Sequence, residues 1–362
     1  MSRKFILEYV WLDGYEAPNL RSKIKVIEWP EGSRQIELKD IPCWNFDGSS
    51  TQQAPGAESE CMLTPIRLYG AQDHLYVLCE VYSVDGSPHQ TNTRSKLAEQ
   101  CDKVDAGCNF WWGFEQEYFI TQDRKILGFP SQGFPEPQGR YYCGVGTNQV
   151  IGRDLATAHM HFCLQFGIDI TGINAEVAIG QWEFQCFSKD TLKACDDLWM
   201  SRYFLYKLAE ASGRDIDISP KPVLGDWNGS GCHTNFSTEK MRNVGGEEYL
   251  TELMNKFAIR HDEHILCYGS GNEKRLTGKH ETQKIDQFSW GVGDRGASIR
   301  IPNEFRKNNW TGYVEDRRPA SNADPYAVAF EITKTTLWAE ELETTPGKAY
   351  ARGKRLVPPS VY

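Results

Sequence analysis

A short aromatic segment that carries two acidic residues is the feature that most constrains the fold. Six of the ten residues in Phe110–Phe119 are aromatic, and Glu115 and Glu117 lie among them. In a strand both carboxylates would point to one face, about 6.5–7 Å apart, because side chains alternate along an extended chain. Like charges in apolar surroundings must protonate or share a cation. The pair is therefore either a hydrated strand face or part of a metal site.

Composition excludes several classes of protein. The chain has 362 residues, of which 40% are hydrophobic, enough for one large domain or two ordinary ones. Its net charge is −9 without a block of Lys or Arg, which argues against a nucleic-acid partner. The eleven cysteines form no Cys-x-x-Cys pair, and no run of eighteen apolar residues occurs. We expect a cytoplasmic protein with reduced thiols and no export or membrane segment.

Strand-like runs separated by turn dipeptides fill the first part of the chain. A polar stretch over 85–93 follows them and precedes the first helical pattern. We therefore place a domain boundary near residue 90, giving a small domain over 1–90 and a larger one over 91–362. The expected strands of the small domain are residues 5–12, 23–29, 35–38 and 74–84.

The remainder mixes helical patterns with segments rich in Glu, His, Arg and Gly, and it predicts an α+β fold with an antiparallel sheet backed by helices. We expect Asp154 to cap one helix and Asp324-Pro325 to open another. The segment Gly128–Gly139, with three Pro and three Gly, is expected to be a surface loop. The predicted helices are residues 94–104, 154–166, 191–212, 247–264 and 325 to about 342.

Further acidic residues and one histidine change the interpretation of the glutamate pair. Glu176, Glu183, His233 and Glu315 all lie in apolar or glycine-rich segments, where an unpaired charge would be costly. Each residue alone is better explained as an ordinary core or surface residue. Together with the first pair they could hold two divalent cations, and so many oxygen ligands favour Mg²⁺ or Mn²⁺ over Zn²⁺.

Four arginines form a second group of candidates. Arg275, Arg295, Arg300 and Arg317 lie near the acidic segments, and guanidinium groups match carboxylate and phosphate oxygens. Surface ion pairs are the plainer explanation for neighbours such as Lys274. Two cations that face several arginines indicate phosphoryl transfer. The sequence lacks a Walker loop and a dinucleotide-binding glycine motif, so cations and arginines would have to hold a nucleotide's phosphates.

With these residues the chain closely resembles class II (eukaryotic-type) glutamine synthetase over essentially its whole length. The resemblance implies a β-grasp-like N-terminal domain, an antiparallel-sheet catalytic domain, and a decamer of two pentameric rings with active sites between adjacent subunits. The motifs that carry it are Trp44–Thr51, Gly113–Tyr118, Asn174–Val177, Gln181–Phe184, Asp226–Gly229, His233–Asn235, Arg275–Gly278, His280-Glu281 and Tyr313–Pro319.

The resemblance implies a role for each candidate residue. One metal would be held by Glu117, Glu176 and Glu183, and the other by Glu115, His233 and Glu315. The expected ATP contacts are Glu115, Glu183, Asn235, Phe236, Ser237, Arg295, Arg300, Tyr313 and Glu315. The expected glutamate contacts are Asp226, Trp227, Gly229, Arg275, Arg295 and Arg317.

The implied reaction has two steps. ATP phosphorylates the side-chain carboxylate of L-glutamate, and ammonia then displaces phosphate to give glutamine. Arg295 and Arg300 would steady the transferring phosphoryl group, and Glu281 would close a flap that excludes water and helps bind ammonium. Asp47 and Ser50, which read alone as an ordinary turn, would bind ammonium and remove its proton at a neighbouring subunit's site.

Two departures and two alternatives accompany the resemblance. Ser230 and Gly293 stand where the family usually has Ala, which affects fit more than chemistry. One alternative is a relative that joins glutamate to a larger amine, against which the intact Asp47 and Glu281 argue. The other is a ring-forming structural or regulatory protein without turnover, against which the complete ligand and arginine sets argue.

Overall fold

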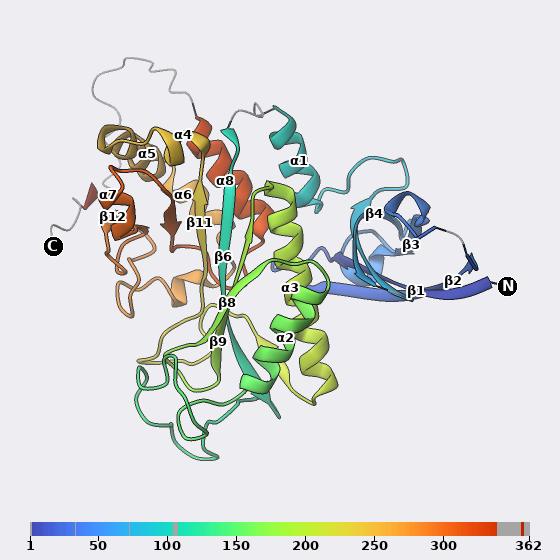
Figure 1. The fold of residues 1–362 in the computed structure, drawn as a ribbon, viewed down its shortest axis with the longest axis horizontal. Helices are drawn as coiled ribbons and strands as arrows, with labels where there is room; N and C mark the ends of the chain where they lie inside the picture. The colour runs from blue at the N-terminus through green and yellow to red at the C-terminus, as the bar shows by residue number, and fades with distance from the viewer. Residues whose placement is uncertain (1, 33, 72, 104–107, 339–355, 358–362) are drawn as a thin grey trace.

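The computed structural model describes residues 2–32, 34–71, 73–103, 108–338 and 356–357, which form two sheets with helices packed mainly around the larger one (Figure 1). The smaller sheet has five strands in the order β2-β1-β5-β4-β3, and only its β1–β5 pair is parallel. Its strands are β1 (Ser2–Leu12), β2 (Leu20–Pro30), β3 (Trp44–Asp47), β4 (Glu60–Ala71) and β5 (His74–Tyr82).

The larger sheet has ten strands, and β6 lies near its centre, where β9, β11, β7 and β10 all pair with it. The sheet is antiparallel except at β12, which runs parallel to β13 and β15. Its strands are β6 (Trp111–Gln122), β7 (Lys125–Ile126), β8 (Ile170–Ala175), β9 (Gln181–Ser188), β10 (Asp215–Asp217), β11 (Cys232–Ser237), β12 (Phe288–Val292), β13 (Ile299–Ile301), β14 (Val314–Asp316) and β15 (Leu356–Val357).

The helices belong to the part of the chain that follows the smaller sheet, so the α+β fold class is confirmed. Asp190 caps α3 by accepting a hydrogen bond from the backbone N–H of Lys193, and Asp324 caps α8 with Pro325 in the first turn. The helices are α1 (Thr93–Lys103), α2 (Arg153–Gln165), α3 (Thr191–Ala211), α4 (Glu239–Asn243), α5 (Glu247–Ile259), α6 (His261–Cys267), α7 (Asn303–Lys307) and α8 (Pro325–Leu337).

The predicted strand at residues 35–38 is wrong. The guanidinium of Arg34 makes two 2.6 Å hydrogen bonds to the carboxylate of Asp40, which also accepts the backbone N–H of Glu37 at 2.9 Å. These contacts close a turn, and a 3₁₀ helix follows at Leu38–Asp40. Ile36 is buried, so it reaches the core from a turn. Strands β3 and β4 were not predicted.

Three helix predictions also need correction. The helix expected over 247–264 is broken at Arg260, whose buried guanidinium turns to Glu263 and Glu331. Gly152, not Asp154, is the residue before α2, and Asp154 instead pairs with Arg214. Helix α8 ends at Leu337, and the predicted extension over 339–342 lies outside the described residues.

Strand β6 shows the alternation that the sequence predicts. Trp112, Phe114, Gln116 and Tyr118 are buried on one face of the sheet, and the residues between them are half-buried on the other. Behind the strand, the fully buried Arg202 of α3 donates a 2.8 Å hydrogen bond to the side-chain oxygen of Gln116. Glu115 and Glu117 therefore share the opposite face.

The two sheets are joined through α3. Its buried Asp196 accepts hydrogen bonds from Arg67 of β4 and from Arg94 of α1, at 2.8 and 2.7 Å. Tyr69 of β4 donates to the neighbouring Asp197 at 2.8 Å. These contacts hold the smaller sheet against the larger part of the protein. The division at residue 90 stays a prediction.

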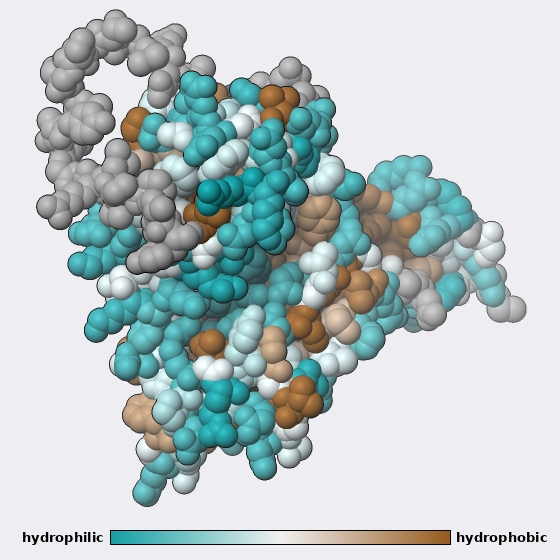
Figure 2. All heavy atoms as spheres, turned by 60° about the vertical axis from the view of Figure 1, so that its left-hand side comes forward, coloured by the Kyte–Doolittle hydropathy of each residue, from teal (hydrophilic) through white to brown (hydrophobic). Residues whose placement is uncertain are grey.

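The surface seen in Figure 2 is mainly hydrophilic, and its apolar groups gather mostly where the smaller sheet meets the larger part. Among the helices that the structure describes, none combines the length and the apolar character that crossing a bilayer requires.

Replacing Arg202 by Leu should destabilise the fold. The substitution would remove the Arg202 donor from the buried oxygens of Gln116 and Ala323, and it would take one of two donors from the carbonyl of Ser321. Each unpaired acceptor costs about 1–3 kcal/mol, so we expect the free energy of unfolding to fall by at least about 2 kcal/mol. Urea unfolding would measure the change, with the exposed Arg306→Leu as a control. Equal stability of the two variants would contradict the role of Arg202.

Candidate active site

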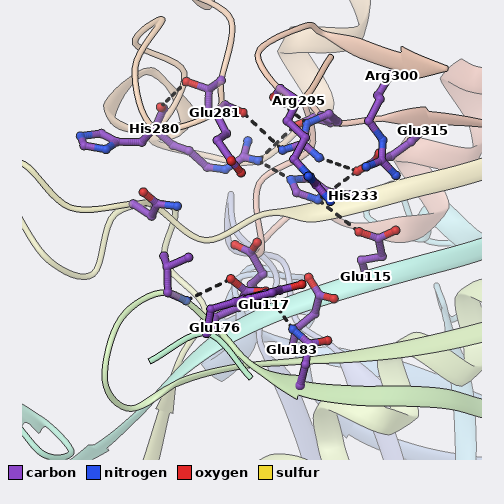
Figure 3. A pocket seen from close by; sticks show the side chains of 18 of the residues that line it. Glu115, Glu117, Glu176, Glu183, His233, His280, Glu281, Arg295, Arg300 and Glu315 are labelled. Carbon is purple, nitrogen blue, oxygen red and sulfur yellow. Dashed lines mark hydrogen bonds and ion pairs between the residues drawn. The ribbon is translucent and has the colours of Figure 1, made fainter. Parts of the chain in front are cut away.

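Strand register brings the candidate residues together on one face of the larger sheet. His233 of β11 is paired with Glu115 of β6, and Glu183 of β9 is paired with Glu117. The side chains on this face border a cavity of about 500 Å³, seen in Figure 3. The predicted residues that line it are Glu115, Glu117, Glu176, Glu183, Gly229, His233, Arg275, Glu281, Arg295, Arg300, Glu315 and Arg317.

Glu117, Glu176 and Glu183 form an acidic cluster on one side of this cavity (Figure 3). Burial raises the pKa of Glu117 to about 7, and burial together with the charge of Glu117 raises the pKa of Glu176 to about 8. Burial and the neighbouring glutamates also raise the pKa of Glu183. Desolvation and the repulsion between the glutamates therefore outweigh the attraction that Arg275 and Arg317 exert on Glu117.

The polar contacts within this cluster come mainly from neutral groups. Glu117 accepts the backbone N–H of Gly231 at 2.7 Å, and Glu176 accepts the side-chain amide of Asn174 at 2.9 Å. Such contacts orient the carboxylates, but they do not remove the repulsion between the like charges that face each other across β6 and β9.

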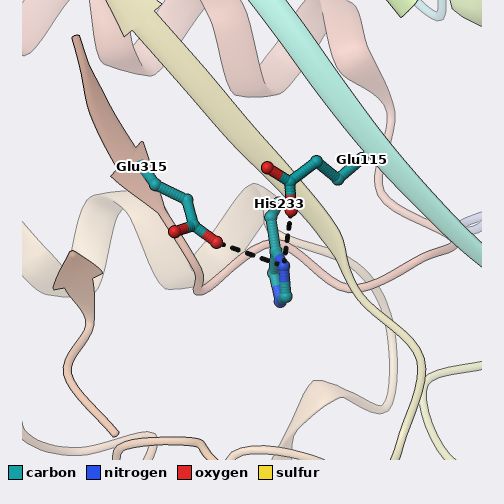
Figure 4. Close-up of side chains that lie close together, drawn as sticks. All are labelled: Glu115, His233 and Glu315. Atoms are coloured by element: carbon teal, nitrogen blue, oxygen red, sulfur yellow. Dashed lines mark hydrogen bonds and ion pairs between the residues drawn. The ribbon is translucent and has the colours of Figure 1, made fainter. Parts of the chain in front are cut away.

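A second group consists of Glu115, His233 and Glu315 (Figure 4). The Nδ1 atom of His233 lies 3.4 Å from a carboxylate oxygen of each glutamate. On its other side, the Nε2 atom accepts a 3.0 Å hydrogen bond from Arg275. Burial and the nearby Arg317 lower the pKa of His233 well below its usual range, so the ring is neutral and its proton is on Nδ1.

These two groups have the chemistry of divalent cation sites. One ligand atom each from Glu115, His233 and Glu315 lies within 4.8 Å of the others, and the same holds for Glu117, Glu183 and His233. Carboxylate oxygens with one imidazole suit Mg²⁺ or Mn²⁺, and a cation would relieve the repulsion in the acidic cluster. Glu176 lies beside the second set without belonging to it, so its predicted role as a ligand stays a prediction.

The four predicted arginines surround the opposite side of the cavity. Arg300 and Arg317 form ion pairs with Glu315 at 2.5 and 2.7 Å. Arg275 is buried, and burial lowers its pKa to about 10, while Arg295 is exposed at the rim. The cavity thus has an acidic wall and a basic wall, which is an arrangement that can hold an anion together with cations.

A second cavity of about 390 Å³ adjoins the first and shares Glu115 and Gln185 with it. The predicted residues Asn235, Phe236, Ser237 and Tyr313 line this second cavity. Asn235 donates a 2.8 Å hydrogen bond to Glu115, which links the two spaces.

Sequence reasoning missed several residues of the second cavity, among them Trp111 and Arg242. The guanidinium of Arg242 lies 4.0 Å from the ring centroid of Trp111. The alternation of β6 could have identified Trp111, because it lies on the same face as Glu115. Nothing comparable marked Arg242, which comes from α4 and reaches the cavity only in the folded chain.

The predicted glutamate contacts are not all at the cavity. Gly229 lines it, and a Cβ atom there would lie 2.4 Å from the carbonyl oxygen of Pro220, so only glycine fits. Trp227 is buried beside Phe129 and Phe134. The carboxylate of the exposed Asp226 lies 3.1 Å from Nε2 of His280 at the cavity's border.

The loop that carries Glu281 crosses the mouth of the cavity (Figure 3). His280 and Glu281 have φ angles of +54° and +57°, which cost about 1–3 kcal/mol each for residues other than glycine. Contacts must compensate for this strain: His280 pairs with Asp226, and the carbonyl of Glu281 accepts a hydrogen bond from Arg317.

Asp47 ends β3 of the smaller sheet (Figure 1), Ser50 lies in the 3₁₀ helix Gly48–Thr51 that follows it, and neither residue lines this cavity. Asp47 is exposed and accepts hydrogen bonds from the hydroxyls of Ser49 and Ser50 at 2.6 and 2.8 Å. The two hydroxyls lower its pKa, so the carboxylate is ionised at neutral pH. The fold of a single chain therefore does not place Asp47 at the cavity of that same chain.

The two departures from the family have different surroundings. The hydroxyl of Ser230 is buried without a hydrogen-bond partner among the described atoms, while its backbone bonds to Pro220 and Ser321. Gly293 has a φ of +69°, a conformation that favours glycine over alanine.

Comparison with known proteins gives the family. The family profile described as "Glutamine synthetase, catalytic domain" matches residues 90–332. A glutamine synthetase of Bradyrhizobium diazoefficiens is 50% identical over 341 residues, which are 92% of this chain and 96% of that protein. The chain belongs to the glutamine synthetase family, class II type.

Two further comparisons agree with this family. The nodule isozyme of glutamine synthetase from Medicago sativa is 46% identical and covers 93% of this chain and 95% of its own. A cryo-EM structure of Plasmodium falciparum glutamine synthetase superposes with a TM-score of 0.73 at 17% identity, and the match covers 92% of this chain and 71% of that one. The latter likeness supports the fold alone.

Divalent cations should stabilise this protein through the acidic cluster. At 100-fold excess over the dissociation constant, Mg²⁺ or Mn²⁺ should add about 2.7 kcal/mol, visible as a higher Tm. Glu183→Gln should reduce this response, because it disables the set of Glu117, Glu183 and His233 and leaves the other set in place. The metal-free variant should be as stable as the parent or more so, because burial disfavours the charged form of Glu183 and the amide cannot ionise. Exposed Glu58→Gln is the control. A full metal response in Glu183→Gln would contradict this assignment.

Proposed function

We propose that this protein joins ammonia to L-glutamate, at the expense of ATP, to give L-glutamine, ADP and phosphate. The observation that carries the proposal is the cavity with three glutamates of raised pKa on one wall and four arginines on the other. Membership of the glutamine synthetase family supports it. The reaction would proceed through γ-glutamyl phosphate, since a carboxylate must be activated before an amine can replace its oxygen.

The arginines would carry the phosphoryl step. Arg295 at the rim and Arg300 beside Glu315 would contact the γ-phosphoryl oxygens and neutralise the charge that develops on them. Arg275 and Arg317 would hold the glutamate. Mg²⁺ or Mn²⁺ on the two ligand sets would polarise the phosphoryl oxygens and offset the acidic wall.

The second cavity would take the nucleoside part of ATP. It is lined by the aromatic rings of Trp111 and Phe187 and by Arg242, which suit the faces of a flat base. Asn235 and Tyr313 belong to the same lining. Because Glu115 borders both cavities, a triphosphate attached to a nucleoside in the second cavity would extend past Glu115 into the first cavity, toward the acidic cluster.

Ammonium would be bound and deprotonated with help from a second subunit. Glu281 at the cavity mouth would exclude water and attract the cation, and Asp47 with Ser50 would complete the site of the adjacent subunit. Their position on the outside of the smaller sheet supports this division. We propose a decamer of two pentameric rings, in the cytoplasm, where the eleven cysteines would stay reduced.

The two alternatives remain distinguishable from this proposal. An enzyme for a larger amine would have less use for the anionic Asp47 and Glu281, so an amine panel should show a preference for ammonia. A ring without turnover would not need to retain paired acidic and basic walls around one cavity.

Product formation should require every component. Glutamine or γ-glutamyl hydroxamate should form only when ATP, glutamate and Mg²⁺ or Mn²⁺ are all present. Glu117→Gln should reduce the rate at least about 100-fold, because it removes charge from the metal cluster, while assembly and the Tm measured without added metal stay near the parent's. An unchanged rate in Glu117→Gln would refute the metal role, and no product with the full mixture would refute the proposed reaction.

Mixing two inactive variants should restore activity if sites form between subunits. Asp47→Asn damages the part that one subunit donates, and Glu117→Gln damages the part that its neighbour supplies. After both are dissociated and reassembled together in equal amounts, about a quarter of the sites should be intact by chance. Each variant reassembled alone is the control. No recovery in the mixture would contradict a shared site.

A further inference from the structure

Gln138 is a residue at the mouth of the first cavity to which the reaction described above gives no role. It lies in the loop over 128–139, which the sequence marked only as a surface loop, and it is half-buried. Its side chain does not line the cavity, but it contacts two residues that do, Asn228 and His280.

The amide of Gln138 is matched to Asn228 at both ends. Its oxygen accepts the backbone N–H of Asn228 at 2.7 Å, and its nitrogen donates to the side-chain oxygen of Asn228 at 2.7 Å. One bond holds the backbone of Asn228 and the other holds its side-chain oxygen, so the two together fix the side chain relative to its own backbone, which one bond could not do. Gly229, whose close packing on Pro220 allows no side chain, follows directly.

The same amide also reaches the loop of Glu281. The nitrogen of Gln138 lies 3.5 Å from Nδ1 of His280, and Nε2 of His280 is 3.1 Å from the carboxylate of Asp226. Three chain segments that are far apart in sequence therefore meet at one glutamine. Because His280 and Glu281 both have left-handed backbone angles, their loop depends on such contacts to keep its path.

We propose that Gln138 is a positioning residue that ties the Asn228 segment to the Glu281 loop and so sets the closed form of the glutamate end of the cavity. This inference rests on the proposed function. Without the tie, Asn228 would rotate and the loop would leave its path more often. Glutamate would then bind more weakly, and water would reach the acyl phosphate and hydrolyse it to glutamate and phosphate.

Gln138→Ala removes all of these contacts, and Gln138→Glu keeps the length but places a carboxylate oxygen against the Asn228 oxygen. Both variants should raise the KM for glutamate roughly tenfold, while the KM for ATP changes less than about twofold, because the second cavity is untouched. They should also release more phosphate than glutamine, whereas the parent releases the two in equal amounts. Gln132→Ala, an exposed glutamine of the same loop, is the matched control.

The measurements are initial rates of phosphate release and of glutamine formation on the assembled enzyme, with glutamate and ATP varied in turn, together with Tm. Asn228→Ala and the double variant Gln138→Ala/Asn228→Ala should have similar KM values for glutamate, because Gln138 acts through Asn228.

Each outcome separates the hypotheses. If the parent is active and both Gln138 variants keep the parental KM values and release phosphate and glutamine in a one-to-one ratio, the inference is overturned and the proposed function stays intact. A fall in Tm with equal increases in both KM values would overturn it in favour of a purely structural role. A parent that forms no glutamine would instead refute the proposed function.

Discussion

The hydrogen bonds behind β6 are the interaction on which the rest of the site depends. Arg202 of α3 donates to Gln116 from the buried side of the sheet, and Gln116 in turn donates to the carbonyls of Glu117 and Ser321. Buried polar groups held in such a network have few alternative positions, since every change leaves a partner unpaired. The face that carries Glu115 and Glu117 is fixed because the side chain of Gln116, on the opposite face, is held by these hydrogen bonds.

The site that results is electrostatically divided. The acidic cluster has raised pKa values because burial disfavours its charged forms and its glutamates repel one another, whereas Glu315 is paired with two arginines and a neutral His233. A cation bound at the acidic wall and an anion bound at the basic wall would each neutralise one half of the site. This arrangement of charges destabilises the folded protein when no ligand is bound, and it serves a purpose only when ligands bind. Such an arrangement is expected at a site where a charged group is transferred.

The remaining parts of the site come from outside the larger sheet. Asp196 of α3 joins Arg67 and Arg94, so the smaller sheet with Asp47 is held firmly against the rest of its own subunit. A rigid junction of this kind would let Asp47 be presented to a neighbouring subunit at a defined position. At the cavity mouth, the contacts of Gln138 would serve the same purpose for a strained loop.

What the sequence determined by itself was local in origin. The alternation along β6 placed Glu115 and Glu117 on one face, Asp324-Pro325 marked the start of α8, and the motifs that resemble the family identified many of the residues that line the cavity. Where local patterns were ambiguous, as at residues 35–38 and at Arg260, side-chain pairs such as Arg34 with Asp40 decided the structure.

Only the tertiary structure decided which distant residues meet. Strand register brought His233 between Glu115 and Glu315, α4 brought Arg242 to Trp111, and one loop brought Gln138 to Asn228. Local propensity carries no information about such meetings, because they depend on the packing of segments tens of residues apart. The sequence therefore supplied the chemical groups and their strand faces, and the fold supplied the distances between them.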